Sequence, residues 1–474
     1  MLINKVVLVN PPFPIQERYQ GAFKNVGTIL PKLGILYIAS ALENVGFEVD
    51  FVDATLEGCS IEETCKRVMG LSPDLIGITT ETPNIYRSTQ LAESIKRHSS
   101  VPIVFGGPHP TLLPEDVLES KAIDFVVIGE GEVTIVDLIN TLNSEKCMEE
   151  MANVKGIGYR NKGNNVILTE KRERVNNLDT ISFPARHLLD IDRYKPTPHQ
   201  YKRLPVLNMI TSRGCPFACT YCSASNIWRR RYTVRSVDNV ISEIVHVKRK
   251  YGAKEIAFWD DLWGVNEKWA EEFCDKMITE KIDINWSCEC RVDTVSESLL
   301  IKMAVAGCWK IFYGLESLDE EILTVVNKNI NLGKINAALS WTRNAGIEVH
   351  GNFILGLPKE TPEKVNTMIE KICKLPLDYV KFNFLTPYPG TVLYNEIKNG
   401  RWGTFNEKLD KLTLHHATFL PSGYTDYEEL DRLRKLVVRK FYFRLSYMLE
   451  RLLSIRTLYD IKRYYEGLIA LMGV

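Results

Sequence analysis

The first 145 residues alternate short apolar runs with segments whose apolar positions recur every three to four residues. Runs rich in β-branched residues predict buried strands, and the periodic segments between them predict helices. Strands that are apolar on both faces and separated by helices are typical of a doubly wound parallel sheet. The sequence therefore predicts a Rossmann-like α/β domain over residues 1–145. Its expected strands are residues 5–9, 48–52, 75–79, 103–105 and 125–128, and its expected helices are residues 34–45, 61–69, 86–98 and 132–142.

The pattern breaks at residue 146, where charged clusters and prolines predict a linker to residue 200 with a small hairpin over 158–168. Six strand–helix units follow within residues 201–395 and predict a partial (β/α)6 barrel. The chemistry of such a barrel belongs at the carboxyl ends of its strands. The expected strands are residues 206–211, 255–259, 285–290, 310–314, 348–355 and 379–385.

Residues 396–474 show helical periodicity and no strand signal, and predict a C-terminal helical domain. Residues 431–474 contain ten Lys and Arg but only four Asp and Glu, a local excess of six positive charges, and aromatic residues are interleaved with them. A cationic amphipathic helix can lie on anionic lipid, so this segment is a candidate for peripheral membrane contact. The alternative is a helical cap with a solvated basic face.

Composition narrows the class of protein. The 474 residues are 45% hydrophobic, and 59 basic side chains balance 59 acidic ones. This excludes a disordered, collagen-like or nucleic-acid-coating chain. No apolar run of about 18 residues exists and the opening residues lack a signal peptide pattern, so we expect a cytoplasmic protein without a nucleic-acid partner. Its eleven cysteines then indicate reduced thiols or metal ligands.

Three of these cysteines follow the first expected barrel strand as a C-x-x-x-C-x-x-C motif: Cys215, Cys219 and Cys222. Three thiolates cannot complete a four-thiolate zinc site. They can hold three irons of a [4Fe-4S] cluster and leave the fourth iron open to a chelating substrate. We therefore predict that this triplet forms the metal site and the catalytic centre.

The motif resembles that of the radical S-adenosylmethionine (SAM) superfamily. The resemblance implies that the open iron binds the amino and carboxylate groups of SAM. It also implies that one electron, delivered by an external donor such as flavodoxin or ferredoxin, cleaves SAM to a 5'-deoxyadenosyl radical.

Further residues at expected strand ends match SAM-binding positions of this superfamily. The resemblance implies that Tyr221 lies near the adenine, that Asp260 or Asp261 takes the amino group, and that Arg291 pairs with the carboxylate. Glu316 belongs to a matching motif at a later strand. The alternatives are loop packing for the tyrosine and ordinary ion pairs at the barrel rim for the charged residues.

A second pair, Cys288 and Cys290, forms a C-x-C motif on one expected strand, with Cys274 and Cys308 nearby in sequence. Strand alternation places both members on one face, which is compatible with a second cluster. Without a longer cysteine array, buried structural thiols are the favoured interpretation.

In the first domain, the Gly129-Glu130-Gly131 segment fails as a dinucleotide motif, because it lacks the third glycine and follows a late strand. The domain instead resembles the cobalamin-binding domain that precedes the barrel in one class of radical SAM enzymes. Glycines at strand ends let the backbone approach a bulky corrin. The matching positions are Asn10, Pro11, Gly106, Gly107, His109, Gly129, Glu130 and Gly131.

Other cobalamin proteins carry D-x-H-x-x-G, whose histidine replaces the lower axial base. Here Asp53 and Gly58 match that motif, but Thr55 stands at the histidine position. The resemblance to the radical class implies that cobalamin binds without a protein ligand below cobalt, which makes its methyl form a readier donor to a carbon radical. His109 remains near the site and is interpreted as part of a structural turn.

We therefore expect a cobalamin-dependent radical SAM methyltransferase that acts on an unactivated carbon, or on phosphorus, of a small-molecule or lipid substrate. Two alternatives stay open. One is a cyclase, rearranging or oxidative enzyme of the same class that transfers no methyl group; the other is a non-enzymatic cobalamin sensor.

Overall fold

The computed structural model describes residues 2–14, 17, 30–455, 461 and 464–467. The chain forms two compact units. The first contains Pro31–Tyr194, the described N-terminal residues and the short segment Leu409–Lys411. The second contains Lys195–Lys408 and the described residues from Leu412 onward.

The first unit is built on a seven-stranded sheet with the order β2-β1-β3-β4-β5-β6-β7. Its first five strands run parallel, as the sequence predicts. Their bounds are β1 (Lys5–Asn10), β2 (Glu48–Asp53), β3 (Leu75–Thr79), β4 (Ile103–Gly106) and β5 (Phe125–Val127). Strand β3 crosses over to the far side of β1, so the carboxyl ends of β1 and β3 form a topological switch point.

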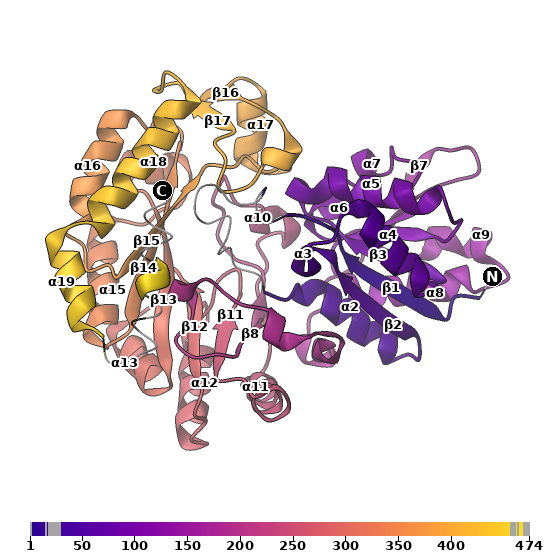
Figure 1. Ribbon diagram of the computed structural model, residues 1–474, viewed down its shortest axis with the longest axis horizontal. Coiled ribbons are helices and arrows are strands. Elements are labelled where there is room, and N and C mark those ends of the chain that lie inside the picture. The colour runs from indigo at the N-terminus through magenta and orange to yellow at the C-terminus, as the bar shows by residue number, and fades with distance from the viewer. Residues whose placement is uncertain (1, 15–16, 18–29, 456–460, 462–463, 468–474) are drawn as a thin grey trace. The chain divides into compact units, whose positions relative to one another are not determined.

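Alternation along β1 explains how helices cover both faces of this sheet (Figure 1). Val6 and Leu8 join one core, and Val7 and Val9 join the core on the opposite face. The first core includes residues of α2 (Leu33–Glu43) and α8 (Glu132–Leu142). The second includes residues of α4 (Ile61–Gly70) and α5 (Ile85–Lys96). Short helices α3 (Ala54–Glu57), α6 (Pro108–Leu112), α7 (Pro114–Val117) and α9 (Cys147–Glu150) complete the unit.

Most of the expected linker belongs to this first unit. Strands β6 (Ile157–Arg160) and β7 (Val166–Leu168) form the expected hairpin, which extends the sheet antiparallel to β5. Arg160 fixes the hairpin, since its Nη1 donates to the carbonyl oxygens of Leu118 and Ser120. The compact unit thus extends to Tyr194, because paired strands bury backbone that a linker would expose.

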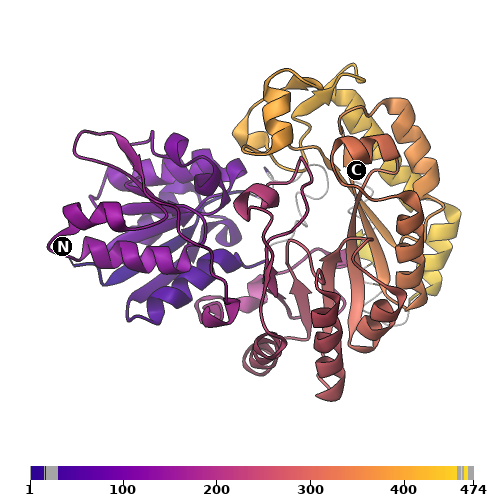
Figure 2. The ribbon, with the colours of Figure 1, turned by 180° about the vertical axis from the view of Figure 1, so that it is seen from behind.

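The second unit carries a six-stranded parallel sheet with the order β15-β14-β13-β12-β11-β8. Two strands, β8 and β15, form edges, so the sheet is an open barrel (Figure 2). The strands are β8 (Val206–Met209), β11 (Glu255–Phe258), β12 (Asn285–Cys290), β13 (Cys308–Glu316), β14 (Glu348–Leu355) and β15 (Tyr379–Phe384). The alternating helices are α11 (Val237–Tyr251), α12 (Glu267–Thr279), α13 (Glu297–Val305), α14 (Glu320–Val325), α15 (Leu332–Asn344) and α16 (Pro362–Ile372).

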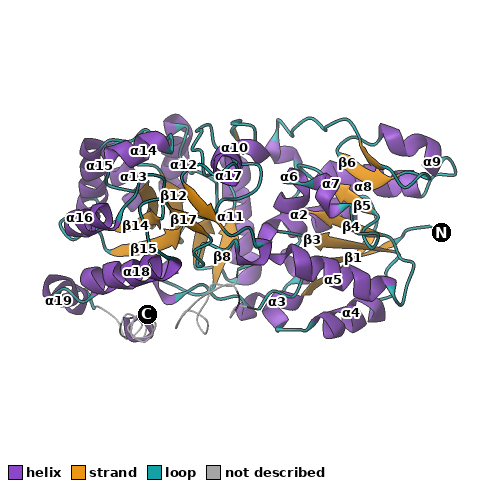
Figure 3. Ribbon diagram, turned by 90° about the horizontal axis from the view of Figure 1, so that it is seen from above, coloured by secondary structure: helices purple, strands orange, loops and turns teal. Residues whose placement is uncertain are grey.

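Large aromatic side chains fill the layer between this sheet and its helices. Phe258 on β11 and Trp286 on β12 pack against Trp263 and Phe273, with ring centroids of Trp263 and Trp286 5.1 Å apart. Figure 3 shows α12, α13 and α15 along one side of the sheet. Because strand side chains alternate, Ser287 and Glu289 lie on the opposite, inner face.

The C-terminal segment departs from the all-helical expectation. It contains a hairpin of β16 (Gly403–Phe405) and β17 (Phe419–Pro421) besides α17 (Val392–Lys398), α18 (Tyr427–Tyr442) and α19 (Leu445–Leu453). Each strand of the hairpin spans only three residues, too few to give a periodic signal. The Tyr442 hydroxyl donates to the Val380 carbonyl oxygen at 2.7 Å and accepts from the Val380 amide at 3.0 Å, which covers the edge strand β15. The segment therefore packs onto the barrel within the second unit.

Candidate active site at the cysteine loop

The three cysteines lie on the loop between β9 (Ser212–Arg213) and α10 (Ala224–Ile227), just after the first barrel strand. The loop starts from a hairpin in which β9 pairs with β10 (Thr233–Val234). Burial, together with smaller contributions from the charges of Cys219, Asp261 and Cys215, raises the pKa of Cys222 to about 12. Burial also raises the pKa of Cys215. Thiolates so placed need a positive centre, and this donor set fits the irons of a cluster.

A second segment holds this loop in place. The Thr220 amide donates to the Val326 carbonyl oxygen at 3.0 Å, and Asn327 Nδ2 donates to the Ala218 carbonyl oxygen at 2.8 Å. Val326 and Asn327 directly follow α14. The cysteine loop is therefore attached to the segment that follows the fourth barrel strand and its helix, a contact without any signal in the sequence.

Arg291 contacts the same loop. Its Nε and Nη2 bind the two carboxylate oxygens of Asp293 at 2.9 Å, and Nη2 also donates to the Lys328 carbonyl oxygen at 2.9 Å. The guanidinium stacks on Phe217 with 3.7 Å to the ring centroid, and Nη1 lies 3.8 Å from Cys219 Sγ. Most of its donors are thus engaged with the protein, and its predicted pairing with the SAM carboxylate stays a prediction.

The two aspartates after β11 differ in environment. Asp260 is 3% exposed, and its Oδ1 accepts four hydrogen bonds from the amides and hydroxyls of Thr211 and Ser212 at 2.5–2.9 Å. Its buried Oδ2 has no hydrogen-bond partner among the described residues, and burial raises its pKa to about 6. Asp261 is exposed, and its Oδ2 accepts from the Gly214 amide at 3.0 Å. Asp260 therefore orients the entry to the cysteine loop, and Asp261 contacts the same loop one residue before Cys215.

Tyr221 and Glu316 interact with each other beside the cysteine loop. Burial raises the pKa of Tyr221 well above its usual value, and the charge and hydrogen bond of Glu316 add to this effect. Glu316 Oε1 also pairs with Lys328 Nζ at 3.0 Å. Glu316 occupies a bulge at the end of β13 with a left-handed φ of 64°, a strained conformation for a residue with a side chain.

Glu289 is a site residue that sequence reasoning missed. It lies on the inner face of β12 between the buried Cys288 and Cys290, and its side chain is exposed. Enough protein surrounds it to disfavour the charged form, so burial raises its pKa to about 7 even though solvent reaches it. An isolated carboxylate between two buried positions of a strand was the available signal.

The C-x-C thiols face the helix layer instead. Cys288 Sγ and Cys290 Sγ are 3.6 Å apart and buried, and burial raises the pKa of Cys288 well above its usual value. These features support the interpretation as structural thiols.

In the first unit, Asn10, Pro11 and Thr55 meet where β1 and β2 end. Asn10 Nδ2 donates to Asp53 Oδ1 at 2.7 Å, and the Tyr194 hydroxyl donates to Asp53 Oδ2 at 2.7 Å. The Thr55 hydroxyl donates to the Pro11 carbonyl oxygen at 2.7 Å. The residue at the histidine position thus anchors the loop after β1, and the aspartate of the motif holds the same edge together.

The carboxyl ends of β3 and β4 lie on this same sheet edge. Gly107 has φ of 108°, and a Cβ there would approach the Thr80 carbonyl oxygen to 2.8 Å. The Thr80 hydroxyl is buried without a hydrogen-bond partner among the described residues. Together with Gly106, these groups offer backbone and a hydroxyl to a large ligand, which fits cobalamin bound without a histidine ligand.

The surroundings of His109 support its interpretation as part of a structural turn. It is 2% exposed, its Nδ1 lies 3.1 Å from Thr82 Oγ1, and burial lowers its pKa to about 4. A neutral, buried imidazole that is bonded to a neighbouring turn is a packing element of the fold.

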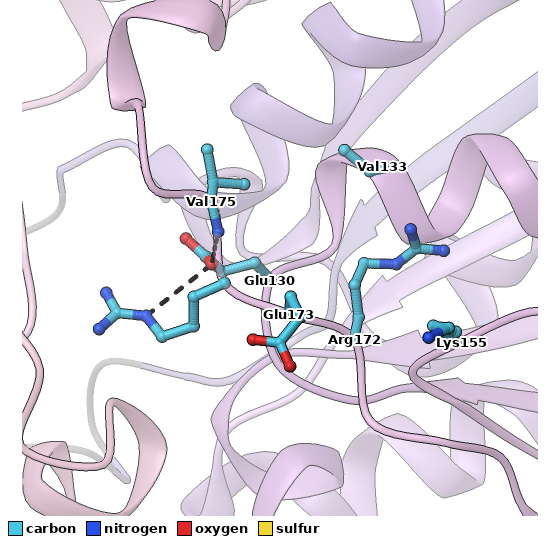
Figure 4. A pocket seen from close by; sticks show the side chains of 7 residues that line it. Glu130, Val133, Lys155, Arg172, Glu173 and Val175 are labelled. Atoms are coloured by element: carbon cyan, nitrogen blue, oxygen red, sulfur yellow. Dashed lines mark hydrogen bonds and ion pairs between the residues drawn. The ribbon is translucent and has the colours of Figure 1, made fainter.

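The Gly129–Gly131 turn follows β5. The sequence matches Glu130 of this turn to a cobalamin-binding position, but its carboxylate contacts the segment after β7. Glu130 Oε2 accepts from the Val175 amide at 2.9 Å (Figure 4) and lies 3.9 Å from Arg174 Nε. These residues line a pocket with Val133, Lys155, Arg172 and Glu173. Glu130 therefore fixes the segment after β7, for which the sequence pattern predicts a linker.

Comparisons with known proteins agree with this division. Residues 19–139 match the model of the B12 binding domain, and residues 209–372 match that of the Radical SAM superfamily. The chain is 33% identical over 473 residues to the uncharacterized methyltransferase PH0819 of Pyrococcus horikoshii, and the alignment covers 99% of both chains. It is 28% identical over 390 residues to the anaerobic magnesium-protoporphyrin IX monomethyl ester cyclase of Rubrivivax gelatinosus, covering 81% of this chain and 69% of the relative.

A solved structure shares the fold. The radical S-adenosylmethionine methyltransferase TsrM of Kitasatospora setae, with cobalamin and a [4Fe-4S] cluster bound, superposes with a TM-score of 0.72 at 16% identity, covering 100% of this chain and 99% of that one. Within the described residues, no helix has the length and apolar character needed to cross a membrane.

Proposed function

Because the chain belongs to the cobalamin-dependent radical SAM enzymes, we propose that it transfers a methyl group from SAM, by way of cobalamin, to an unactivated carbon or a phosphorus of a small-molecule substrate. The observation that carries this proposal is Thr55, which stands where a histidine would bind cobalt and instead donates to the Pro11 carbonyl oxygen. A site without a protein ligand below cobalt favours donation of a methyl group to a carbon radical.

When bound, the cluster supplies one electron to open SAM to a carbon radical, and cobalamin carries the methyl group. Cys215, Cys219 and Cys222 hold the cluster. Asp261, Glu316 and Tyr221 bind SAM beside it. Arg291 positions the cysteine loop by its contact with Cys219, and Asp260 does so through Thr211 and Ser212.

In the first unit, the backbone at Pro11, Gly106, Gly107 and Gly129 contacts cobalamin. The orphaned Thr80 hydroxyl offers it a hydrogen bond. Other residues shape the edge through contacts within the protein, namely the hydrogen bonds of Asn10, His109 and Glu130. Gly131 belongs to this group because a Cβ there would approach Ile38 to 2.7 Å.

The direct test is an anaerobic assay of reconstituted protein with SAM that carries a labelled methyl group. We expect label in the bound cobalamin and in the product, together with 5'-deoxyadenosine once a reductant is added. Cys219→Ala should form no 5'-deoxyadenosine while still binding cobalamin. A verified substrate that gains no label would disprove the proposal.

A second candidate is a cyclase or other oxidative reaction without net methyl transfer, which the similarity to the Rubrivivax cyclase supports. The same assay separates the two functions. The cyclase predicts 5'-deoxyadenosine with an unlabelled product.

The reaction needs a reductant, and we propose flavodoxin or ferredoxin in the cytoplasm as its source. A one-electron donor of this kind matches the single electron that the cluster passes to SAM. Replacing the chemical reductant in the assay with reduced flavodoxin should sustain 5'-deoxyadenosine formation.

We also propose peripheral contact of the C-terminal helices with an anionic membrane. Helix α19 exposes an apolar stripe in which Leu445 is 75% and Leu453 76% exposed, with Leu449 and Leu452 between them. Exposed Lys435, Arg439 and Lys440 on the preceding helix α18 supply positive charge. Apolar insertion combined with basic residues is the physical basis of interfacial binding.

Co-sedimentation with vesicles tests this contact. The protein should pellet with vesicles of phosphatidylglycerol at low salt and not with neutral phosphatidylcholine. The double variant Leu449→Glu/Leu453→Glu should remain in the supernatant. The contact is refuted if the wild-type protein does not pellet with anionic vesicles at low salt.

A further inference from the structure

The last two strands of the barrel sheet carry polar side chains on one face. Asn352 on β14 lies beside Lys381 on β15 in the register of the sheet, and Asn383 follows two positions later on β15. The alternate residues Phe353 and Phe382 are buried and stack on each other, with 5.2 Å between their ring centroids. Because strand side chains alternate, the two asparagines and the lysine project from the face opposite to these rings.

This polar face lies on the same side of the sheet as the cysteine loop. Ile354 follows Asn352 by two residues, and both Ile354 and Tyr221 of the cysteine loop pack against one apolar cluster. Lys381 also acts on Glu289 of β12, since its charge lowers the pKa of that carboxyl against the larger, opposing effect of burial. The three polar side chains therefore face the side on which the cysteine loop lies.

The two amides of this face are left without partners in the protein. Neither Asn352 nor Asn383 forms a side-chain hydrogen bond with any residue in the described part of the chain, and Asn383 Oδ1 is buried. A buried polar atom without a hydrogen bond costs free energy, so native proteins rarely keep one unless water or a ligand satisfies it. Both residues are only half-buried overall, so part of each stays within reach of a ligand.

Charge is distributed unevenly around this side of the sheet. Asp260 and Asp261 after β11, Glu289 on β12 and Glu316 at the end of β13 lie close enough for the other three to raise the pKa of Glu289. Lys381 is on β15, which is an edge strand of the sheet. An anion is repelled by the acids and attracted by the lysine, so an anionic group fits beside β15.

We propose that Lys381, Asn352 and Asn383 bind an anionic substituent of the methyl acceptor, a carboxylate or a phosphoryl group. This inference rests on the proposed function, since it takes the acceptor as the molecule held on this side of the sheet. The ammonium supplies a charge and three donors, and each amide nitrogen supplies two more donors. A charge-assisted contact of this kind fixes one end of the acceptor and thereby orients the atom that receives the methyl group.

Small aromatic anions serve as probes of this site. Phenylphosphonate and benzoate are titrated into the anaerobic protein loaded with cluster, cobalamin and SAM, and benzyl alcohol is the neutral probe. We expect the wild type to bind at least one anion about tenfold more tightly than benzyl alcohol. The anion with the higher affinity distinguishes a phosphoryl from a carboxylate substituent. If neither anion binds more tightly than benzyl alcohol, the inference is overturned.

The variant Lys381→Met removes the charge and keeps the length of the side chain. It should bind the preferred anion about tenfold more weakly and benzyl alcohol normally, because a charge-assisted hydrogen bond is lost. Lys381→Arg should restore most of the preference. Lys374→Met, an exposed position in the turn after α16, is the matched control and should bind the anion as the wild type does. An anion preference that survives in Lys381→Met contradicts the inference.

The affinity for SAM separates this site from the SAM site. In a titration of SAM into the cluster-loaded protein without probes, Lys381→Met should bind SAM as tightly as the wild type does. If the variant loses affinity for SAM to the same degree as for the anion, Lys381 belongs to the SAM site and the inference fails.

Asn383 gives a second readout, in which affinity and stability change in opposite directions. Asn383→Leu removes a buried oxygen that has no hydrogen-bond partner among the described residues. We expect the urea midpoint of the apoprotein to rise and the affinity for the preferred anion to fall about three- to tenfold. An amide with a purely structural role predicts a lower midpoint and unchanged affinity, and that result would rule out Asn383 as a ligand-binding residue.

These results are separable from the proposed function. Anion binding is measured without turnover, so it can depend on Lys381 even when no labelled product forms. Conversely, methyl transfer can occur in a protein whose anion affinity does not depend on Lys381 or Asn383.

Discussion

Residues of one chemical type behave differently here because their partners differ. Asp260 accepts four hydrogen bonds through one oxygen, and burial still raises its pKa to about 6. Glu289 has no such bonds with the described residues, and its pKa rises to about 7. Both carboxylates thus change charge near neutral pH, and binding at this site should respond to small changes in pH.

Glycine at position 107 is required for two separate reasons, a left-handed φ of 108° and a close approach to Thr80. Gly129 has a left-handed φ of 85°, but a Cβ at this position would meet open space, since no atom lies within 4 Å. We expect Gly107→Ala to lower the free energy of unfolding by about 2–4 kcal/mol and Gly129→Ala by about 1 kcal/mol. Urea titration of the apoprotein measures both losses, and equal losses would show that φ strain alone matters.

At this scale the sequence identifies residues whose role is set by local spacing. The cysteine triplet and the glycines of the strand ends can be located because one short segment carries each signal. Glu289 and the actual partner of Glu130 cannot, since both depend on segments far away in the chain. Glu130 bonds to Val175, 45 residues later, in a stretch whose pattern suggests no structure.

Among the elements, the two-residue segment Val326 to Asn327 after α14 holds the cysteine loop in place. It binds the cysteine loop at Thr220 and at Ala218, and the neighbouring Lys328 links Arg291 to Glu316. An irregular segment of this kind restricts the positions of three thiols without supplying a ligand itself.

Asn327→Ala removes the side-chain bond to the Ala218 carbonyl oxygen. We expect the reconstituted cluster to be lost to a chelator roughly two- to tenfold faster, because one net hydrogen bond is worth about 0.5–1.5 kcal/mol. The decay of the cluster absorbance measures this rate. Asn336→Ala, on the exposed face of α15, should decay at the wild-type rate, and identical rates for all three proteins would argue against the role of this segment.

Predictability of the elements follows their length and pattern. The parallel strands of both sheets lie within a few residues of their expected positions, because an apolar run bounded by helices is a strong signal. The hairpin of β16 and β17 escapes prediction because each strand has three residues and only non-local contacts stabilise it. In the predicted linker of residues 146–200 the hairpin is found as expected, whereas the packing of residues 146–194 with the first unit depends on non-local contacts that leave no pattern.

The whole molecule consists of two units with separate cores and separate cofactors. Cobalamin, a [4Fe-4S] cluster and SAM, the cofactor set predicted from the sequence, are confirmed by membership of the family. A ligand that binds only the folded form of a unit raises the stability of that unit.

Calorimetry should therefore resolve two unfolding transitions in the apoprotein. We expect added hydroxocobalamin to raise the midpoint of one transition. Cluster loading with SAM should raise the midpoint of the other. A single transition that both ligands shift equally would show that the two units unfold cooperatively.

The left-handed φ of Glu316 has an evolutionary consequence. A glycine at this position would relax the bulge of β13 but would leave the buried Lys328 without its carboxylate partner. A lineage that loses the glutamate therefore exchanges backbone strain for an unpaired buried charge.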